Sequence, residues 1–180
     1  MQAPVRFPLF KDANSMIQSA QWLQYFTQLA VPVPNIGTTT NDNAAAGIVG
    51  EYKEDSVASS SAVPLTSELT APVASLSLSA GDWDVSGAVN FNMGPTTQYG
   101  VIAAAISTSA AAMPSLPDSS AAAMIFPTLA VAGAIGTPYI ITGMKRISLA
   151  MTTTVYLVTN DYFTTSTCAA YGTIRARRVR

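Results

Sequence analysis

The sequence predicts a mainly β fold, an antiparallel β-sandwich or jelly roll that follows one short N-terminal helix. From about Ser56 onward, apolar and polar residues alternate with a period of two, which is the period of strands that bury one face. Turn residues separate these runs at hairpin spacing, and no helical period intervenes. The strands are rich in Ala, Ser, Thr and Gly, whose small side chains let sheets and neighbouring chains approach closely.

The single helix is predicted over Asn14–Ala30. Asp12 or Asn14 can cap its first turn, and Pro32 ends it. Its apolar stripe comprises Trp22, Leu23, Phe26 and Leu29. A lone amphipathic helix has to bury such a stripe against its own domain, against copies of itself or against another protein. We expect this helix to dock the chain on a larger particle.

A segment rich in Pro, Gly, Asn and Thr follows the helix and lacks a clear period. This composition is typical of a linker. The sequence therefore predicts three parts, which are an N-terminal anchoring segment (1–30), a linker (31–62) and a β-sandwich head (63–180).

The strands of the head are expected in the following order. Val73–Ser79 and Trp83–Phe91 both alternate, and the Gly81–Asp82 turn between them predicts an antiparallel hairpin. Further strands are predicted over Tyr99–Thr108, Ile125–Val131, Tyr139–Thr142, Arg146–Met151, Val155–Asn160 and Ala169–Arg180.

Charge is scarce and uneven in this chain. Charged residues make up 11% of it and apolar residues 49%, whereas an average domain carries about 25% charged residues. From Val85 to Met144 the only charged residue is Asp118. A chain with so little charge is expected to bury surface between copies, and we predict a homotrimer.

The formal net charge of −1 favours neither nucleic acid nor a membrane as a partner. Four arginines lie in the last six positions, namely Arg175, Arg177, Arg178 and Arg180. They could bind phosphate, but solvated or paired arginines on a terminal strand are the favoured interpretation.

The residue inventory argues against catalysis. The sequence contains no histidine, which removes Ser-His-Asp and Cys-His chemistry and histidine-containing metal sites. It also lacks the glycine-rich fingerprints of nucleotide sites. The single Cys168 has no imidazole base and is expected to be a small buried apolar residue. We therefore expect a protein that is not an enzyme and that has no cofactor or metal.

A few polar and aromatic residues remain as candidates for sites. Asp82 and Asp84 could bind calcium or assist glycoside cleavage, but a structural ion pair of Asp84 with Arg175 or Arg177 across a sheet is at least as plausible. Three tyrosines fall near predicted turns, where they could stack on sugars of a host surface or plug the ends of the sandwich, namely Tyr99, Tyr139 and Tyr162.

At GDWDVSG (Gly81–Gly87) the sequence resembles a C-terminal β-domain of tailed-phage fibre and appendage proteins. The resemblance covers four blocks in the same order, which are Val63–Phe91, AISTSAAAMP (Ala105–Pro114), RISLAMTTTVYLV (Arg146–Val158) and YGTIRARRVR (Tyr171–Arg180). It implies a virion structural protein with a trimeric β-sandwich head. Phe7–Leu29 is similar to the anchoring start of podophage structural proteins, although Ala13 stands where a glycine is usual.

These observations predict a short trimeric tail fibre or appendage of a phage, docked by its N-terminus on a tail adaptor or nozzle. A capsid head fibre or decoration protein is the alternative. A host-polysaccharide depolymerase or a lectin-like module is the alternative of a different class, and a host surface glycan is then the partner. Pro4 and Pro8 interrupt any signal peptide, and no membrane span is expected, so the chain is predicted to be made in the host cytoplasm and assembled into the virion.

Overall fold

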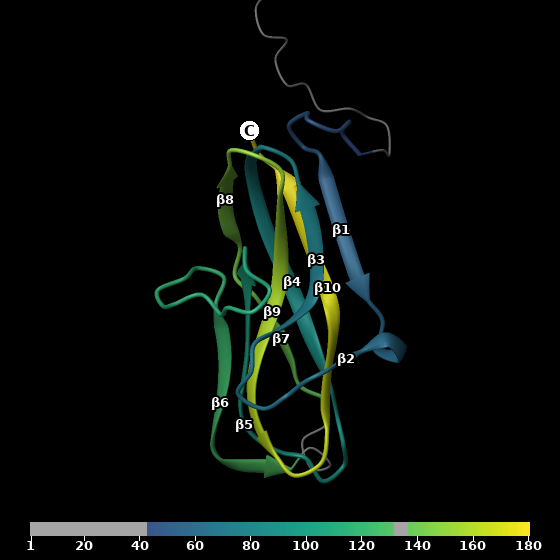
Figure 1. Ribbon diagram of the computed structural model, residues 1–180, viewed down its shortest axis with the longest axis vertical. Helices are drawn as coiled ribbons and strands as arrows, with labels where there is room; N and C mark the ends of the chain where they lie inside the picture. Colours follow the sequence, from purple (N-terminus) through teal and green to yellow (C-terminus); the bar gives the residue numbers. More distant parts are fainter. Residues whose placement is uncertain (1–42, 132–136) are drawn as a thin grey trace, which may run out of the picture. The chain divides into compact units, whose positions relative to one another are not determined.

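The computed structural model describes residues 43–131 and 137–180, which belong to a unit that begins at Asp42. They form two antiparallel β-sheets that face each other (Figure 1). The elements are β1 (Tyr52–Val57), the 3-10 turn η1 (Ser59–Ser61), β2 (Val63–Pro64), β3 (Ala71–Leu78), β4 (Gly81–Met93), β5 (Gln98–Ser107), β6 (Ala122–Val131), β7 (Tyr139–Ile141), β8 (Lys145–Leu149), β9 (Thr153–Thr164) and β10 (Cys168–Arg178). The predicted helix Asn14–Ala30 lies outside the described residues. Among those residues, no helix is long and apolar enough to span a membrane.

The strand order is that of a jelly roll. Sheet 1 has the order β1-β10-β4-β7, with β2 beside β10 and β8 beside β4, and sheet 2 has the order β3-β9-β5-β6. The antiparallel pairs β1 with β10, β3 with β9, β4 with β7 and β5 with β6 are those of one long ribbon, folded back at its middle and rolled into two layers. The prediction of an antiparallel β-sandwich is thereby confirmed.

The predicted hairpin between Val73–Ser79 and Trp83–Phe91 is wrong. β3 pairs with β9 in sheet 2, whereas β4 pairs with β10 in sheet 1, so the chain crosses from one sheet to the other between them. Gly81 makes this crossing with φ +134°, a conformation that side chains disfavour. Alternation identifies the buried face of a strand but not its partner, because both strands bury that face in the same core.

The core lies between the inner faces of the two sheets. Leu76 and Leu78 on β3 and Trp83 and Val85 on β4 are buried, in the alternation that the sequence predicted. The free thiol of Cys168 is also buried. The sheets pack closely at Gly87, where a Cβ atom would lie 2.9 Å from Cδ1 of Leu157 on the facing sheet and 2.9 Å from the Thr173 carbonyl oxygen on the neighbouring strand.

The sandwich begins earlier in the sequence than the predicted head. β1 lies within the segment predicted to be a linker (31–62), and it pairs along its length with β10, from Tyr52 opposite Arg177 to Val57 opposite Gly172. Its sequence YKEDSV has three consecutive charged residues, which conceal the period of two. An edge strand tolerates such residues because much of its surface faces water.

Candidate interaction surface

The two sheets differ sharply in charge. Strands of sheet 1 carry Lys53, Glu54, Asp55, Asp82, Asp84, Lys145, Arg146, Arg175, Arg177 and Arg178. The strands of sheet 2 carry one charged residue, Asp161, and its exposed fraction is only 2%. The outer face of sheet 2 is therefore uncharged.

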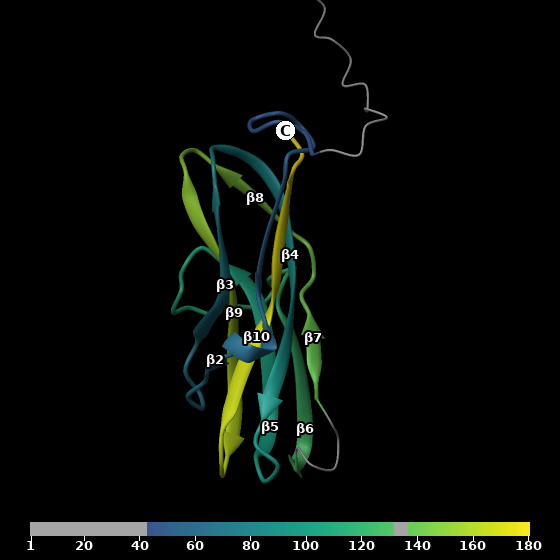
Figure 2. The ribbon, with the colours of Figure 1, turned by 90° about the vertical axis from the view of Figure 1, so that its right-hand side faces the viewer.

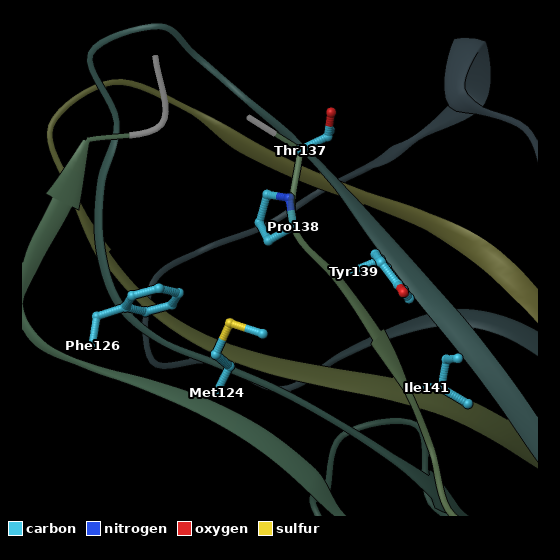
Figure 3. Close-up of a pocket in the computed structure, with 6 residues that line it drawn as sticks. All are labelled: Met124, Phe126, Thr137, Pro138, Tyr139 and Ile141. Atoms are coloured by element: carbon cyan, nitrogen blue, oxygen red, sulfur yellow. The ribbon is translucent and has the colours of Figure 1, made fainter. Parts of the chain in front are cut away.

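A groove opens along one edge of the sandwich. β6 is the edge strand of sheet 2 and β7 is the edge strand of sheet 1, and the two lie beside each other (Figure 2). We call the hollow between them the edge groove. It has a volume of about 450 Å³ and is lined by Met124, Phe126, Thr137, Pro138, Tyr139 and Ile141 (Figure 3). Phe126 and Met124 form one side of the groove, and Pro138, Tyr139 and Ile141 form the other.

The strands that border the edge groove expose large apolar side chains. The exposed fractions are 42% for Met124, 72% for Ile125, 44% for Leu129, 39% for Val131, 60% for Tyr139 and 61% for Ile141. Exposed surfaces rich in large apolar side chains are typical of interaction sites.

The three predicted surface tyrosines divide into two groups. Tyr139 and Tyr162 are exposed, at 60% and 39%, whereas Tyr99 is fully buried and is therefore not a surface aromatic. The register of β5 shifts at Gly100, and this bulge turns Tyr99 to the inner face, contrary to simple alternation. Its ring packs edge-on against Phe126 with a centroid distance of 4.7 Å.

Burial also affects the phenol group of Tyr99. Burial raises the pKa of this phenol above its ordinary value. Its hydroxyl has no hydrogen-bond partner among the described residues. A buried hydroxyl without a partner lowers the stability of the fold.

The predicted ion-pair residues gather on the outer face of sheet 1. Asp84 lies opposite Arg177 in the β4–β10 register, and both line a shallow hollow together with Arg175. The ion pair that Asp84 forms is with Arg146 of β8, at 3.8 Å between Oδ1 and Nε. The Nε of Arg175 instead donates a hydrogen bond to the Ser86 hydroxyl at 3.2 Å. Asp84 has a strand on each side, and the sequence could not show which neighbour it pairs with.

The other acid candidate, Asp82, approaches the chain terminus, since its Oδ2 lies 3.9 Å from the Nε of Arg180. No group of three or more His, Cys, Asp or Glu side chains suited to a metal gathers within residues 43–131 and 137–180.

A buried ion pair that sequence reasoning missed joins Glu51 to Arg178. The Arg178 Nε donates to Glu51 Oε2 at 3.0 Å, and the two side chains, that of Arg178 and that of Glu51, are only 6% and 5% exposed. The guanidinium also donates to the Ala80 carbonyl at 2.8 Å and to the Ser79 hydroxyl at 2.6 Å. It stacks 4.4 Å from the ring centre of Trp83. Every side of this guanidinium is thus occupied, so it stabilises the sandwich and leaves no room for a ligand.

The electrostatics of this pair follow from its contacts. Burial alone would raise the pKa of Glu51, but the hydrogen bond from the Gly47 N–H and the interaction with Arg178 outweigh it and lower the pKa. Gly81 makes room for the guanidinium, because a Cβ there would overlap a terminal nitrogen of Arg178. The alternation of β10 does place Arg178 on the inner face with Ile174. The sequence therefore indicated that Arg178 is buried, but it could not identify Glu51 as the partner, because the two residues are 127 positions apart.

A second buried acid, Asp161, lies on the inner side of β9. Its Oδ1 accepts the Ala103 N–H at 3.1 Å, and the Thr159 hydroxyl oxygen lies 3.0 and 3.1 Å from its two carboxyl oxygens. Burial raises the pKa of Asp161 to about 7, although these hydrogen bonds oppose the shift. Burial, together with the charge of Asp161, also raises the pKa of the Cys168 thiol to about 12.

Comparison with known proteins adds little to this picture. The chain matches no protein-family model and no curated protein. Among solved structures, it is similar to a chain in the structure of infectious bursal disease virus Gx strain, with a TM-score of 0.40 and 12% sequence identity over 82% of this chain. The match covers 37% of that viral chain, so this protein spans little more than a third of its length. The fold assignment rests on the strand order alone.

Proposed function

We propose that this chain is a structural protein of a bacteriophage particle, with a β-body that associates with further copies and with other virion proteins. The observation that carries the proposal is the jelly roll with one apolar, uncharged side. Double-sheet jelly rolls occur in viral capsid proteins, lectins and cupins. The fold alone does not distinguish among these three classes of protein, so the assignment depends on the properties of the surface.

The residues of the phage-like motif GDWDVSG have structural roles in this fold. In GDWDVSG, Gly81 forms the crossing between the sheets, Trp83 fills the core beneath Arg178, and Gly87 lets the sheets approach closely. The motif thus consists of residues that the corner of this sandwich requires. Its resemblance to fibre and appendage proteins supports the same body in this chain, and with it the virion role.

A non-catalytic role is part of the proposal. The sequence offers no histidine for acid–base or metal chemistry. The two buried carboxyl groups, Glu51 and Asp161, are held by hydrogen bonds inside the sandwich, where a substrate does not reach them.

A role in the virion implies a segment that anchors the chain to the particle and an assembly of several copies of the chain. We propose that the N-terminal segment docks on the particle through Trp22, Leu23, Phe26 and Leu29, and that the β-body is a homotrimer. A tail position makes the chain a short fibre or appendage, and a capsid position makes it a head fibre or decoration protein.

Purified particles of the phage that encodes the chain provide the test. Mass spectrometry should find the chain in them, and cryo-electron microscopy should place it on the tail or on the capsid in multiples of three. Deletion of residues 1–31 should yield a soluble β-body that no longer enters particles. Absence of the chain from intact particles would refute the virion role, and incorporation of the truncated chain would refute the anchor.

Glycan binding is a second candidate function because Tyr139 and Tyr162 are exposed. Aromatic rings at a surface can stack on sugars. A glycan array with the purified β-body tests this, with Tyr139→Ala and Tyr162→Ala as paired variants. Incubation with host capsule tests the depolymerase alternative, and release of shorter oligosaccharides would contradict the non-catalytic proposal.

A further inference from the structure

We propose that the edge groove between β6 and β7 is the contact surface between copies of this chain, and that a second copy occupies it. This inference rests on the oligomer in the proposed function and adds the surface by which it forms. Three observations carry it, namely the distribution of charge, the open edge of the sandwich and the size of the apolar surface.

Charge favours a second copy over a foreign partner. In a symmetric assembly each copy presents its own surface to its neighbours, so a charged patch near the axis would meet others of the same sign. The strands β5, β6 and β7 carry no charged residue at all, and contacts among copies of this surface involve no like-charge repulsion. The charged outer face of sheet 1 then remains in water.

The edge of the sandwich at β6 and β7 leaves apolar side chains exposed, which favours burial of this edge by another chain. At the opposite edge of the sandwich, β1 of sheet 1 and β3 of sheet 2 lie close together, and Lys53 of β1 donates a hydrogen bond to the Ser77 carbonyl at 2.9 Å. At the groove edge, Ile125 and Ile141 are 72% and 61% exposed. Water contacts these apolar side chains unless another surface covers them.

The available area suits an interface between subunits. The ten residues of β6 extend over at most about 33 Å at ~3.3 Å per residue, because the register shifts within the β5–β6 ladder. The edge is ~10 Å wide from sheet to sheet, and the neighbouring strand β5 adds ~5 Å. The strip thus has a planar area of at most roughly 500 Å², which is of the same order as the ~800 Å² per partner of a standard interface.

Small residues also lie on the outer face of sheet 2 beside β6. Ala103 of β5 lies opposite Ala123 of β6, where Ala123 is exposed and Ala103 is half-buried. A neighbouring copy can therefore approach this part of the sheet closely.

The test compares two substitutions that add the same charge. Ile141→Glu places a carboxylate in the groove, and Met151→Glu places one at a similarly exposed apolar residue (70%, against 61% for Ile141) between β8 and β9, outside the groove. Sedimentation equilibrium of the full chain should give a multiple of 18.7 kDa for the wild type. We expect Ile141→Glu to raise the dissociation constant of the oligomer at least ~100-fold, the cost of burying one unpaired carboxylate, and Met151→Glu to leave it unchanged.

The outcomes separate this inference from the proposed function. A monomeric wild type would overturn the homotrimer and this inference together. An oligomeric wild type whose mass does not respond to Ile141→Glu would overturn the groove as the interface and leave the virion role intact.

A second measurement avoids reliance on the folding of that variant. A photo-crosslinking benzoyl-phenylalanine at Tyr139 preserves an aromatic ring at the groove. Cross-links to the β-body of another copy support the inference. Cross-links solely to residues 1–42 of the same chain, or solely to a different virion protein, would overturn it.

Discussion

Replacing Asp161 by asparagine should make the protein more stable at neutral and alkaline pH. The Thr159 hydroxyl has one hydrogen, and its oxygen lies 2.7 Å from the Ala103 carbonyl oxygen, the shortest of its contacts. When that hydrogen is donated to Ala103, no hydrogen remains between Thr159 and an ionised Asp161. A protonated Asp161 supplies the missing hydrogen, and the side-chain amide of the Asp161→Asn variant would supply it at every pH.

The magnitude follows from the pKa of Asp161, which is about 7 in the fold and 3.8 in its ordinary environment. Because the folded pKa is raised, folding takes up a proton between these values. The stability from this group is complete below pH ~4 and is lost as pH rises toward ~7. At about 1.4 kcal/mol per pKa unit, the loss is on the order of 4 kcal/mol. The Asp161→Asn variant should recover most of it at pH 8 and little of it at pH 4.

Urea unfolding at pH 4, 5, 6, 7 and 8, followed by tryptophan fluorescence, to which buried Trp83 contributes, measures the free energy of unfolding of both proteins. Asp118→Asn is the matched control with the opposite sign. Burial alone would raise the pKa of Asp118, but its contacts with Lys145 and Ser120 outweigh it and lower the pKa. Removing its charge should therefore destabilise the protein by nearly the same amount from pH 8 down to pH 4, because the contribution of this group is lost only as the pH falls below about 3.8 and through the lowered pKa. A difference between wild type and Asp161→Asn that is independent of pH would refute the reasoning.

Three further substitutions test the core. Tyr99→Phe removes the unpartnered buried hydroxyl and should stabilise the fold by about 1 kcal/mol in urea unfolding, and a loss of stability would show that the hydroxyl is satisfied. Arg178→Met leaves the Glu51 carboxylate buried and unpaired, so unfolding at pH 7 should become easier by about 3 kcal/mol, and by less at pH 4, where the acid takes up a proton. Gly87→Ala forces a methyl group toward Leu157 and should lower the thermal midpoint, at a cost of about 1–3 kcal/mol, and an unchanged midpoint would mean that the sheets can separate freely there.

The sequence revealed the faces of the strands more readily than their partners. Alternation placed Leu76 and Trp83 in the core because burial of one face is a local property of a strand. It could not show that β3 and β4 belong to different sheets, because a sharp turn can close a hairpin or cross between layers. The position of Tyr99 near a predicted turn left open whether its ring faces solvent or the sandwich, because the bulge that turns it inward is set by the tertiary register at Gly100.

The interaction surface was the hardest part to foresee from the sequence. Apolar residues of β6 and β7 look like core residues, because nothing local distinguishes an apolar face turned to the core from one turned to an open edge. The side chains of Met124 and Ile141 are found exposed only once the strand order makes their strands the last of each sheet.

The gap in charge from Val85 to Met144 is the one feature of the sequence that does locate this surface. In a ribbon that is folded back at its middle, the central strands β5, β6 and β7 come together at one edge, and the terminal strands β1 and β10 lie toward the other. A stretch of chain without charges around that middle therefore becomes one uncharged side of the molecule. The charge of Asp118, the one acid within this stretch, is balanced by its ion pair with Lys145. The jelly-roll topology thus converts a linear absence of charge into a contact surface, so a charge introduced on β6 or β7 should impair association far more than one introduced on β1 or β10.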